Sequence, residues 1–267
     1  MKPNIFIKQL PLILILPFLF TSCNSDANND PSETDCIEDF NYDDTTKEGP
    51  SNWYNFCVAE GENQCGSTVR QTPVDIVGTI DDPMLTDLNF NYEASTTDII
   101  NNGHTIQFNY NGSATLNLQG DAYNLLQFHF HTQSEHTVDS KQYPLEVHLV
   151  HQNASKDLAV VGVFFELGSE NSFLNQFITH LPTNKDDSYL DMNMNYNASD
   201  LFPTNKSYYT YEGSLTTPPC SEIVEWFVME TPLKASQAQL DALADIMHDN
   251  FRPIQPLNGR TISRYVQ

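Results

Sequence analysis

Short segments in which apolar and polar residues alternate fill the chain between Thr79 and Tyr211, separated by Asn, Gly and Asp. Alternation with a period of two places the apolar side chains on one face of a β-strand, whereas a helix repeats every 3.6 residues. We therefore expect a mainly β (α+β) fold, a single domain around a large, mostly antiparallel twisted central sheet with a few short surface helices. The clearest segments are Thr105–Tyr110, Ala114–Leu118, Leu125–His131 and Leu145–His151.

Two apolar runs and two helical patterns complete this organisation. Leu158–Phe165 and Ile223–Met229 are continuously apolar, as expected for strands that are covered on both faces. One helix should begin at Ser236, where Ser-Gln-Ala-Gln forms a capping box before apolar residues at helical spacing. A weaker helical pattern covers Glu170–His180. The chain of 267 residues shows no internal repeat and suits one large domain with additions.

The N-terminus has the layout of a secretory signal. Residues 1–22 carry two lysines, then an apolar run from Leu10 to Phe20 that is too short to span a membrane as a mature helix. Ser22-Cys23 is similar to a bacterial lipobox, so we expect residues 1–22 to be removed and Cys23 to be lipidated. The alternative is a secreted protein without this anchor. Residues 23–35 then form a flexible acidic tether, and 36–267 the folded domain, in the cell envelope, facing the periplasm or the outside.

Net charge restricts the class of binding partner, and the cysteine content indicates disulfides. The net charge of −23 becomes −25 without the two lysines of the signal, which argues against nucleic acid and leaves the lipid as the only membrane contact. Four cysteines remain beyond Cys23, and export to an oxidising compartment favours disulfides in one of three connectivities. Their spacing fits no common zinc–thiolate site. They are Cys36, Cys57, Cys65 and Cys220.

Three histidines carry the chemical signal. His129 and His131 alternate with phenylalanines and so share one face of a strand, and His148 lies in a second strand pattern. Three such imidazoles can hold three corners of a tetrahedron around zinc and leave the fourth for water; the alternative is that they are buried and hydrogen-bonded. Gln127 and Glu146 each precede a histidine by two residues, where they can hydrogen-bond the ring nitrogen that faces away from the metal. A zinc with only neutral ligands keeps its full charge, which favours a hydration or hydrolysis catalyst.

Several separated motifs resemble the alpha carbonic anhydrases, in the family's order, from about Phe40 to Arg260. They are Gln71–Ile76, Asn101–His104, Ser134–Val138 with Tyr143, Glu146–Val150, Gly213–Pro219 and Phe251–Leu257. The resemblance implies a zinc enzyme, a lyase, with ligands His129, His131 and His148. Its reaction would be the reversible hydration of CO2 to bicarbonate and a proton by zinc-bound hydroxide, as is established for that family.

The resemblance also implies roles around the zinc. Thr216 matches the threonine that accepts a hydrogen bond from the zinc-bound nucleophile and donates one to a glutamate, here Glu135. His104 matches the proton shuttle that relays a proton to bulk water. The apolar wall for CO2 would be Val150, Val160, Leu215, Thr217, Val224 and Trp226, and the hydrophilic wall Tyr42, Asn102 and Gln107. Each apolar residue could equally belong to an ordinary core.

Further implications concern the remaining cysteines, histidines and inhibitors. A Cys65–Cys220 disulfide would pin the loop that bears Thr216, which leaves Cys36 to pair with Cys57. His136 and His151 match family residues that are buried in hydrogen bonds. Sulfonamide and anion inhibitors are expected.

This sequence departs from the family pattern at the cavity rim. Phe40 stands where an N-terminal Trp is usual, and Thr132 follows His131 where a Trp is common. Two other functions stay open from the sequence: a binding module on the same fold, and an esterase that uses the same nucleophile.

Overall fold

The computed structural model of the protein describes residues 36–59 and 61–267. The predicted signal peptide of residues 1–22, the lipidation site at Cys23 and the tether of residues 23–35 lie outside this described part. Residues from Cys36 to Gln267 belong to one unit.

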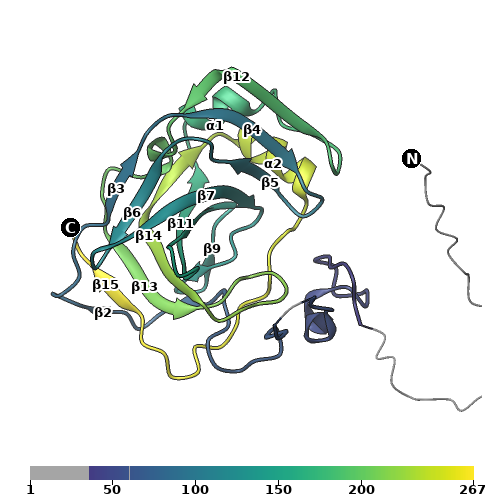
Figure 1. The fold of residues 1–267 in the computed structure, drawn as a ribbon, viewed down its shortest axis with the longest axis vertical. Coiled ribbons are helices and arrows are strands. Elements are labelled where there is room, and N and C mark those ends of the chain that lie inside the picture. The colour runs from purple at the N-terminus through teal and green to yellow at the C-terminus, as the bar shows by residue number, and fades with distance from the viewer. Residues whose placement is uncertain (1–35, 60) are drawn as a thin grey trace, which may run out of the picture. The chain divides into compact units, whose positions relative to one another are not determined.

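The main element is a twisted sheet of twelve strands (Figure 1). Ten of them follow the order β12-β4-β5-β7-β10-β11-β14-β13-β15-β2, while β6 pairs with both β7 and β3. The strands are β2 (Ile80–Asp81), β3 (Asn89–Tyr92), β4 (Ser95–Asn101), β5 (Ile106–Asn109), β6 (Ala114–Leu118), β7 (Asp121–His131), β10 (Leu145–Gln152), β11 (Leu158–Leu167), β12 (Ser188–Tyr196), β13 (Tyr208–Gly213), β14 (Val224–Ala235) and β15 (Ser263–Tyr265).

Neighbouring strands in this sheet are antiparallel, except for the parallel pairs β11–β14 and β15–β2. The predicted mainly β fold with a large, mostly antiparallel sheet is confirmed. Each segment expected as a strand overlaps a strand. The segment Thr105–Tyr110 exceeds β5 by one residue at each end, whereas β7 and β14 extend well beyond the apolar patterns. A small separate sheet has the order β1-β8-β9 and contains β1 (Asp75–Ile76), β8 (Thr137–Val138) and β9 (Lys141–Gln142).

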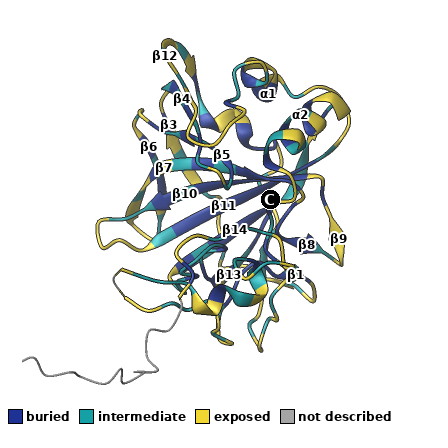
Figure 2. Cartoon of the chain, turned by 90° about the vertical axis from the view of Figure 1, so that its right-hand side faces the viewer, coloured by how far each residue is buried: buried dark blue, intermediate teal, exposed yellow. Residues whose placement is uncertain are grey.

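The central strands carry different side chains on their two faces. In β7, Phe128 and Phe130 are buried in the larger hydrophobic core, and the alternation of a strand turns His129 and His131 to the opposite face. Phe128 stacks on Phe108 with ring centroids 4.7 Å apart. Figure 2 shows β10, β11 and β14 buried through the middle of the molecule. The continuous apolar run predicted for β11 is therefore explained by cover on both faces.

A second, smaller core lies on the histidine face of the sheet. Its buried members come mainly from β11, β13 and β14, joined by residues near β1. They are Val74, Ile76, Tyr143, Val160, Phe164, Tyr209, Tyr211, Val224, Trp226, Val228 and Ile262. The histidines of β7 and β10 thus sit beside a packed apolar block and not in open solvent.

The helices are few and short, as expected. α2 (Gln237–Met247) begins at the predicted capping box, in which the Ser236 hydroxyl accepts from the Gln239 N–H and the Gln239 side chain accepts from the Ser236 N–H. α1 (Ser172–Phe177) is shorter than the predicted helix, because the Asn171 side chain caps it and the chain turns after Phe177.

Two 3-10 helices, η1 (Pro50–Asn55) and η2 (Ala198–Leu201), complete the described elements. No helix in the described residues has the length and apolar character needed to cross a membrane.

Two disulfides fix the segment before β1. Cys36 pairs with Cys57 and Cys65 pairs with Cys220, the connectivity that the family resemblance implies. We call residues 36–57 the N-terminal cystine loop. Within it, Ile37 bridges to Phe56, and the fully buried Trp53 donates its indole N–H to the Glu48 carbonyl at 2.9 Å. The loop therefore has a defined conformation although it contains no long element.

Candidate metal centre

Three imidazoles converge on the histidine face of the sheet. His129 of β7 and His148 of β10 are directly paired across the two antiparallel strands, and His131 follows on the same face of β7. Their ring centroids lie 4.6 to 5.5 Å apart. One nitrogen from each ring lies within 4.8 Å of the others, so the three could hold one metal ion.

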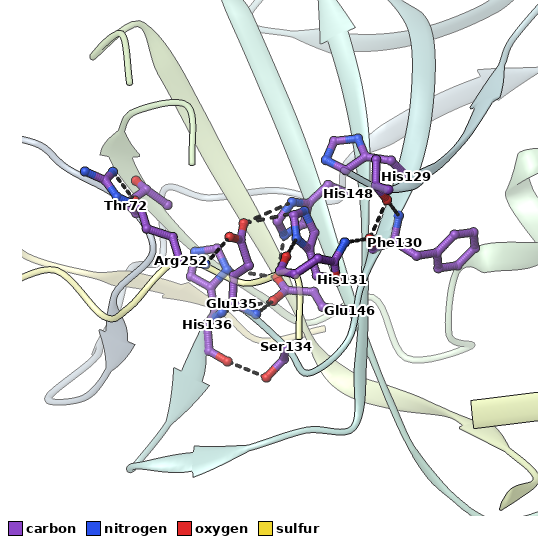
Figure 3. A network of polar contacts seen from close by, with 12 residues as sticks. Thr72, His129, Phe130, His131, Ser134, Glu135, His136, Glu146, His148 and Arg252 are labelled. Carbon is purple, nitrogen blue, oxygen red and sulfur yellow. Dashed lines mark hydrogen bonds and ion pairs between the residues drawn. The ribbon is translucent and has the colours of Figure 1, made fainter. Parts of the chain in front are cut away.

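The opposite nitrogens of these rings are held by protein groups. His129 Nδ1 lies 2.9 Å from Gln127 Oε1, and His131 Nδ1 lies 2.7 Å from the Asn250 carbonyl oxygen. Each Nδ1 must donate to its oxygen partner, which leaves the Nε2 lone pair free. Figure 3 shows His129, His131 and His148 gathered in this arrangement.

His148 is oriented by a carboxylate. Its Nε2 lies 2.9 Å from Glu146 Oε1, although the two groups are poorly aligned for a regular hydrogen bond. Burial acts to lower the pKa of His148, but the Glu146 charge outweighs it and raises that pKa above its ordinary value. A carboxylate behind an imidazole makes the ring a stronger metal ligand.

Burial, and after it the charges of the two neighbouring imidazoles, lowers the pKa of His129 well below its ordinary value. Burial likewise lowers the pKa of His131. Both rings are therefore neutral near pH 7, which is the state that binds a metal.

The unsatisfied atoms at this site fit a zinc ion. His131 Nε2 is buried without any hydrogen-bond partner, although buried polar atoms are nearly always paired. Three imidazole nitrogen donors on one face, with no fourth side chain of the described residues in the set, match the ligands of a catalytic zinc.

Glu146 is anchored on both of its oxygens. Oε2 accepts from the backbone N–H groups of Glu135 and His136, at 2.9 and 3.0 Å, and Oε1 lies 2.8 Å from His136 Nδ1. Burial acts to raise the pKa of this fully buried carboxyl, but the charges of His136 and His148 hold it well below its ordinary value. His136 Nε2 contacts the Tyr211 hydroxyl at 2.6 Å, so His136 serves the carboxylate and is no ligand in the three-histidine set.

A glycine makes room for that carboxylate. Gly162 of β11 is paired with His148 across the sheet. A Cβ at position 162 would lie 2.8 Å from Glu146 Oε1, which is closer than real Cβ contacts. Only glycine therefore lets Glu146 keep its present position beneath His148.

Glu135 is also fully buried next to the imidazoles. Its Oε1 accepts the backbone N–H of Arg252 at 2.8 Å. Its Oε2 lies 3.5 Å from His131 Nε2 and 3.8 Å from His148 Nδ1, and has no hydrogen-bond partner in the described residues. Thr216 is buried as well, but its predicted hydrogen bond to Glu135 is not formed in this structure.

Arg252 connects the site to the Cys65–Cys220 disulfide. Its buried guanidinium donates to the Gln71 side chain, at 2.8 Å, and to the Thr72 and Cys65 carbonyls. The Gln71 amide in turn donates to the Cys220 carbonyl at 3.1 Å. One network therefore holds both the Arg252 segment and the loop that carries Thr216. Figure 3 shows its Arg252 part, with Thr72 and Glu135.

A cavity of about 250 Å³, here called the inner cavity, opens beside His129 and His131. The predicted hydrophilic-wall residues Tyr42, Asn102 and Gln107 all line it, and so does His104. Its other lining residues are Phe40, Thr105, Gln127, His129, His131 and Thr217.

Most of the predicted apolar wall lies deeper than this cavity. Val160, Val224 and Trp226 are buried in the second core, and Val150 and Leu215 pack against it. Only Thr217 of the predicted substrate-pocket set lines the inner cavity. Trp226 contacts the site from the second core, with its ring centroid 4.8 Å from that of His148.

His151, His180 and His248 lie outside the three-histidine group. His151 is buried between the Tyr92 hydroxyl and the Ala159 carbonyl, and burial lowers its pKa to about 4. His180 stacks on Tyr189 just after α1, and His248 ends α2.

Two residues of the site were not assigned roles from the sequence. Asn250 holds His131 through its carbonyl and the Thr132 N–H through its side chain, at 2.7 Å each. Arg252 holds Glu135 through its backbone. Arg252 lies in the family motif Phe251–Leu257 and Asn250 directly precedes it, but the motif alone does not show that this segment contacts the histidines.

Comparison with known proteins agrees with this geometry. Residues 48–266 match the family model described as eukaryotic-type carbonic anhydrase. A carbonic anhydrase of Nostoc sp. is 36% identical over 266 residues, covering 98% of both chains. The solved alpha-carbonic anhydrase of Photobacterium profundum superposes with a TM-score of 0.78 at 41% identity, over 84% of this chain and 100% of that one. That of Thermovibrio ammonificans, in complex with the inhibitor sulfanilamide, gives a TM-score of 0.79 at 35% identity, over 85% and 99%.

The Gly162 contact generates a prediction. In Gly162→Ala the new methyl group should displace the Glu146 carboxylate and loosen His148, so we expect the affinity for zinc to fall about 10- to 100-fold. Chelator competition measures it. Gly168→Ala is the matched control, because its Cβ would meet only the exposed stem of Lys234. Equal zinc affinity in both variants would contradict the role given to Gly162.

Proposed function

The chain belongs to the eukaryotic-type, or alpha, carbonic anhydrase family, and from that premise we propose how its own residues carry out the reversible hydration of CO2. Members of this family are zinc enzymes, and the three-histidine group can hold the metal. The observation that carries the proposal is the convergence of three imidazoles with an unpartnered buried nitrogen among them.

We assign the zinc to His129, His131 and His148. A zinc ion with three imidazole ligands acts as a Lewis acid and makes water a nucleophile at neutral pH, as is established for carbonic anhydrases. The chain's contribution is to hold the rings: Gln127 and the Asn250 carbonyl fix His129 and His131, and Glu146 fixes His148.

Thr216 and Glu135 are proposed to orient the attacking oxygen. Glu135 Oε2 is the acceptor without a partner at the site, so it is available to the Thr216 hydroxyl. Once that hydroxyl donates to the carboxylate, its oxygen can only accept, and it selects a nucleophile that still carries a proton. The Arg252 N–H keeps the other Glu135 oxygen in place.

CO2 is proposed to bind between Thr217 and the predicted apolar wall. Val150 and Leu215 are the partly exposed members of that side, and Val160, Val224 and Trp226 support it from the second core. An apolar wall suits a nonpolar substrate, whereas Tyr42, Asn102 and Gln107 on the cavity lining suit ordered water. Sulfonamides and small anions are expected to inhibit at the same place.

His104 is proposed as the proton shuttle, because it lines the inner cavity while 23% of its side chain stays exposed. An imidazole titrates near neutrality and can pass a proton from cavity water to solvent.

The reaction itself is tested on the protein lacking residues 1–23. We expect one zinc per chain and CO2 hydration that a sulfonamide abolishes, and His148→Ala should lose both the zinc and the activity. Zinc content is measured by atomic absorption and hydration by stopped-flow pH change. A chain without stoichiometric zinc or acceleration would be a binding module, and an esterase rate above the hydration rate would point to an ester hydrolase.

The shuttle is tested by His104→Ala. In dilute buffer we expect kcat for hydration to fall about tenfold or more, and added imidazole should restore it, because free imidazole replaces the missing relay. His180→Ala is the matched control, since His180 stacks on Tyr189 and does not line the inner cavity. Full turnover of His104→Ala in dilute buffer would place the shuttle elsewhere.

The two disulfides indicate an extracytoplasmic protein. We further propose a lipid anchor on Cys23 in a bacterial envelope, which rests on the sequence before residue 36. The full-length protein should carry the added mass of the lipid and enter the detergent phase, whereas Cys23→Ser should stay in the aqueous phase. A Cys23→Ser variant that still fractionates with membranes would refute the anchor.

A further inference from the structure

His104 lies at the junction of two cavities. The inner cavity holds His129 and His131, and a second cavity of about 490 Å³, here called the outer cavity, is lined by Met247, His248 and Asp249 among others. Phe40, Tyr42 and His104 line both. A proton that leaves the inner cavity through His104 therefore enters the outer one.

The backbone at His104 is fixed. The Asn102 side-chain oxygen accepts from the N–H groups of His104 and Thr105, at 2.9 Å each. The Asn250 amide donates to the His104 carbonyl at 3.0 Å. Only the imidazole itself can rotate, so whatever contacts the ring decides where its nitrogens point.

Two residues of the N-terminal cystine loop contact that ring. Phe40 stacks on it, with centroids 4.0 Å apart and planes 9° from parallel. Asp39 Oδ1 lies 3.4 Å from His104 Nε2, and Asp39 Oδ2 lies 3.5 Å from Lys185 Nζ. The stem of Lys185 runs against Gly103, where a Cβ would come within 2.7 Å of it. Asp39 is thus held between a cation and the imidazole.

We propose that Asp39 is a positioning residue for proton transfer: its solvent-exposed carboxylate, paired with Lys185, turns Nε2 of His104 toward the protein surface. The proposal rests on the shuttle role of His104. The stacked Phe40 ring holds the plane of the imidazole. The Cys36–Cys57 disulfide closes the loop that carries Asp39 and Phe40.

The charges around the His104 ring set the direction in which its pKa shifts. Burial lowers the pKa of His104, Asp39 raises it, and Lys185 lowers it. These two are the charged groups closest to the imidazole; the other titratable groups that line the two cavities are Tyr42, Asp43, His129, His131, His248 and Asp249. Removing the Asp39 charge must therefore move the pKa of His104 down, and removing the Lys185 charge must move it up.

The experiment uses the zinc-loaded protein with Asp39→Asn, Lys185→Gln and a control, Glu38→Gln, whose exposed carboxylate contacts neither group. NMR titration of the His104 ring should show opposite shifts for the first two and none for the control. In dilute buffer Asp39→Asn should lower kcat about threefold or more, with KM for CO2 unchanged and full recovery in imidazole. Because 66% of the Asp39 side chain is exposed, the variant should keep its fold and zinc.

Three results would overturn the proposal in distinguishable ways. An unchanged His104 titration in Asp39→Asn would show that the contact does not act on the ring. A shifted titration with unchanged kcat in dilute buffer would show that the contact does not serve the reaction. If His104→Ala itself kept full turnover in dilute buffer, the shuttle assignment would fail first, whatever Asp39 does to the ring.

Discussion

The register between β7 and β10 is the constraint on which the site depends. It places His148 opposite His129 and Glu146 opposite His131, so ligands from two strands meet on one face. A slip of one residue would turn every side chain of a strand to the other face, and would exchange the histidines for Phe128 and Phe130. Because those rings fill the larger core, the same packing that stabilises the sheet also enforces the register that aligns the imidazoles.

Two buried carboxylates hold the imidazoles in place, and burying their charges costs desolvation free energy. Glu135 and Glu146 are almost fully buried, and each would be strongly destabilising without partners. Backbone N–H groups and His136 satisfy Glu146, but only one oxygen of Glu135 is satisfied. A buried polar group without a partner calls for a specific explanation, and a catalytic role is one of them. The unpaired oxygen of Glu135 therefore supports the orienting role that we propose for this residue beside Thr216.

Local patterns made the strands, the α2 cap and the three histidines predictable, because a period of two and a capping box are written in neighbouring residues. The support of the site was not predictable in this way. Asn250 reaches His131 across 119 positions and Arg252 reaches Glu135 across 117, so no spacing along the chain reveals them. In the sequence, Gly162 is one position in an apolar run, and only the fold brings Glu146 against it. The end of α1 is likewise not written in the local pattern, since Phe173, Leu174 and Phe177 already bury its apolar face.

The N-terminal cystine loop shows how a segment outside the main sheet can complete an active site. A segment with only a 3-10 turn and two buried hydrophobic side chains, Ile37 and Trp53, has little apolar area to hold it in place, so its conformation needs another source of stability. Closing a loop of this size with a disulfide is worth about 3 kcal/mol in the chain-entropy view. The Cys36–Cys57 disulfide closes the loop, and Trp53 packs against Phe40 and Tyr42. These contacts allow Phe40 and Tyr42 to form a wall of the inner cavity. The oxidising compartment that stabilises the loop is therefore also a condition for the geometry around His104.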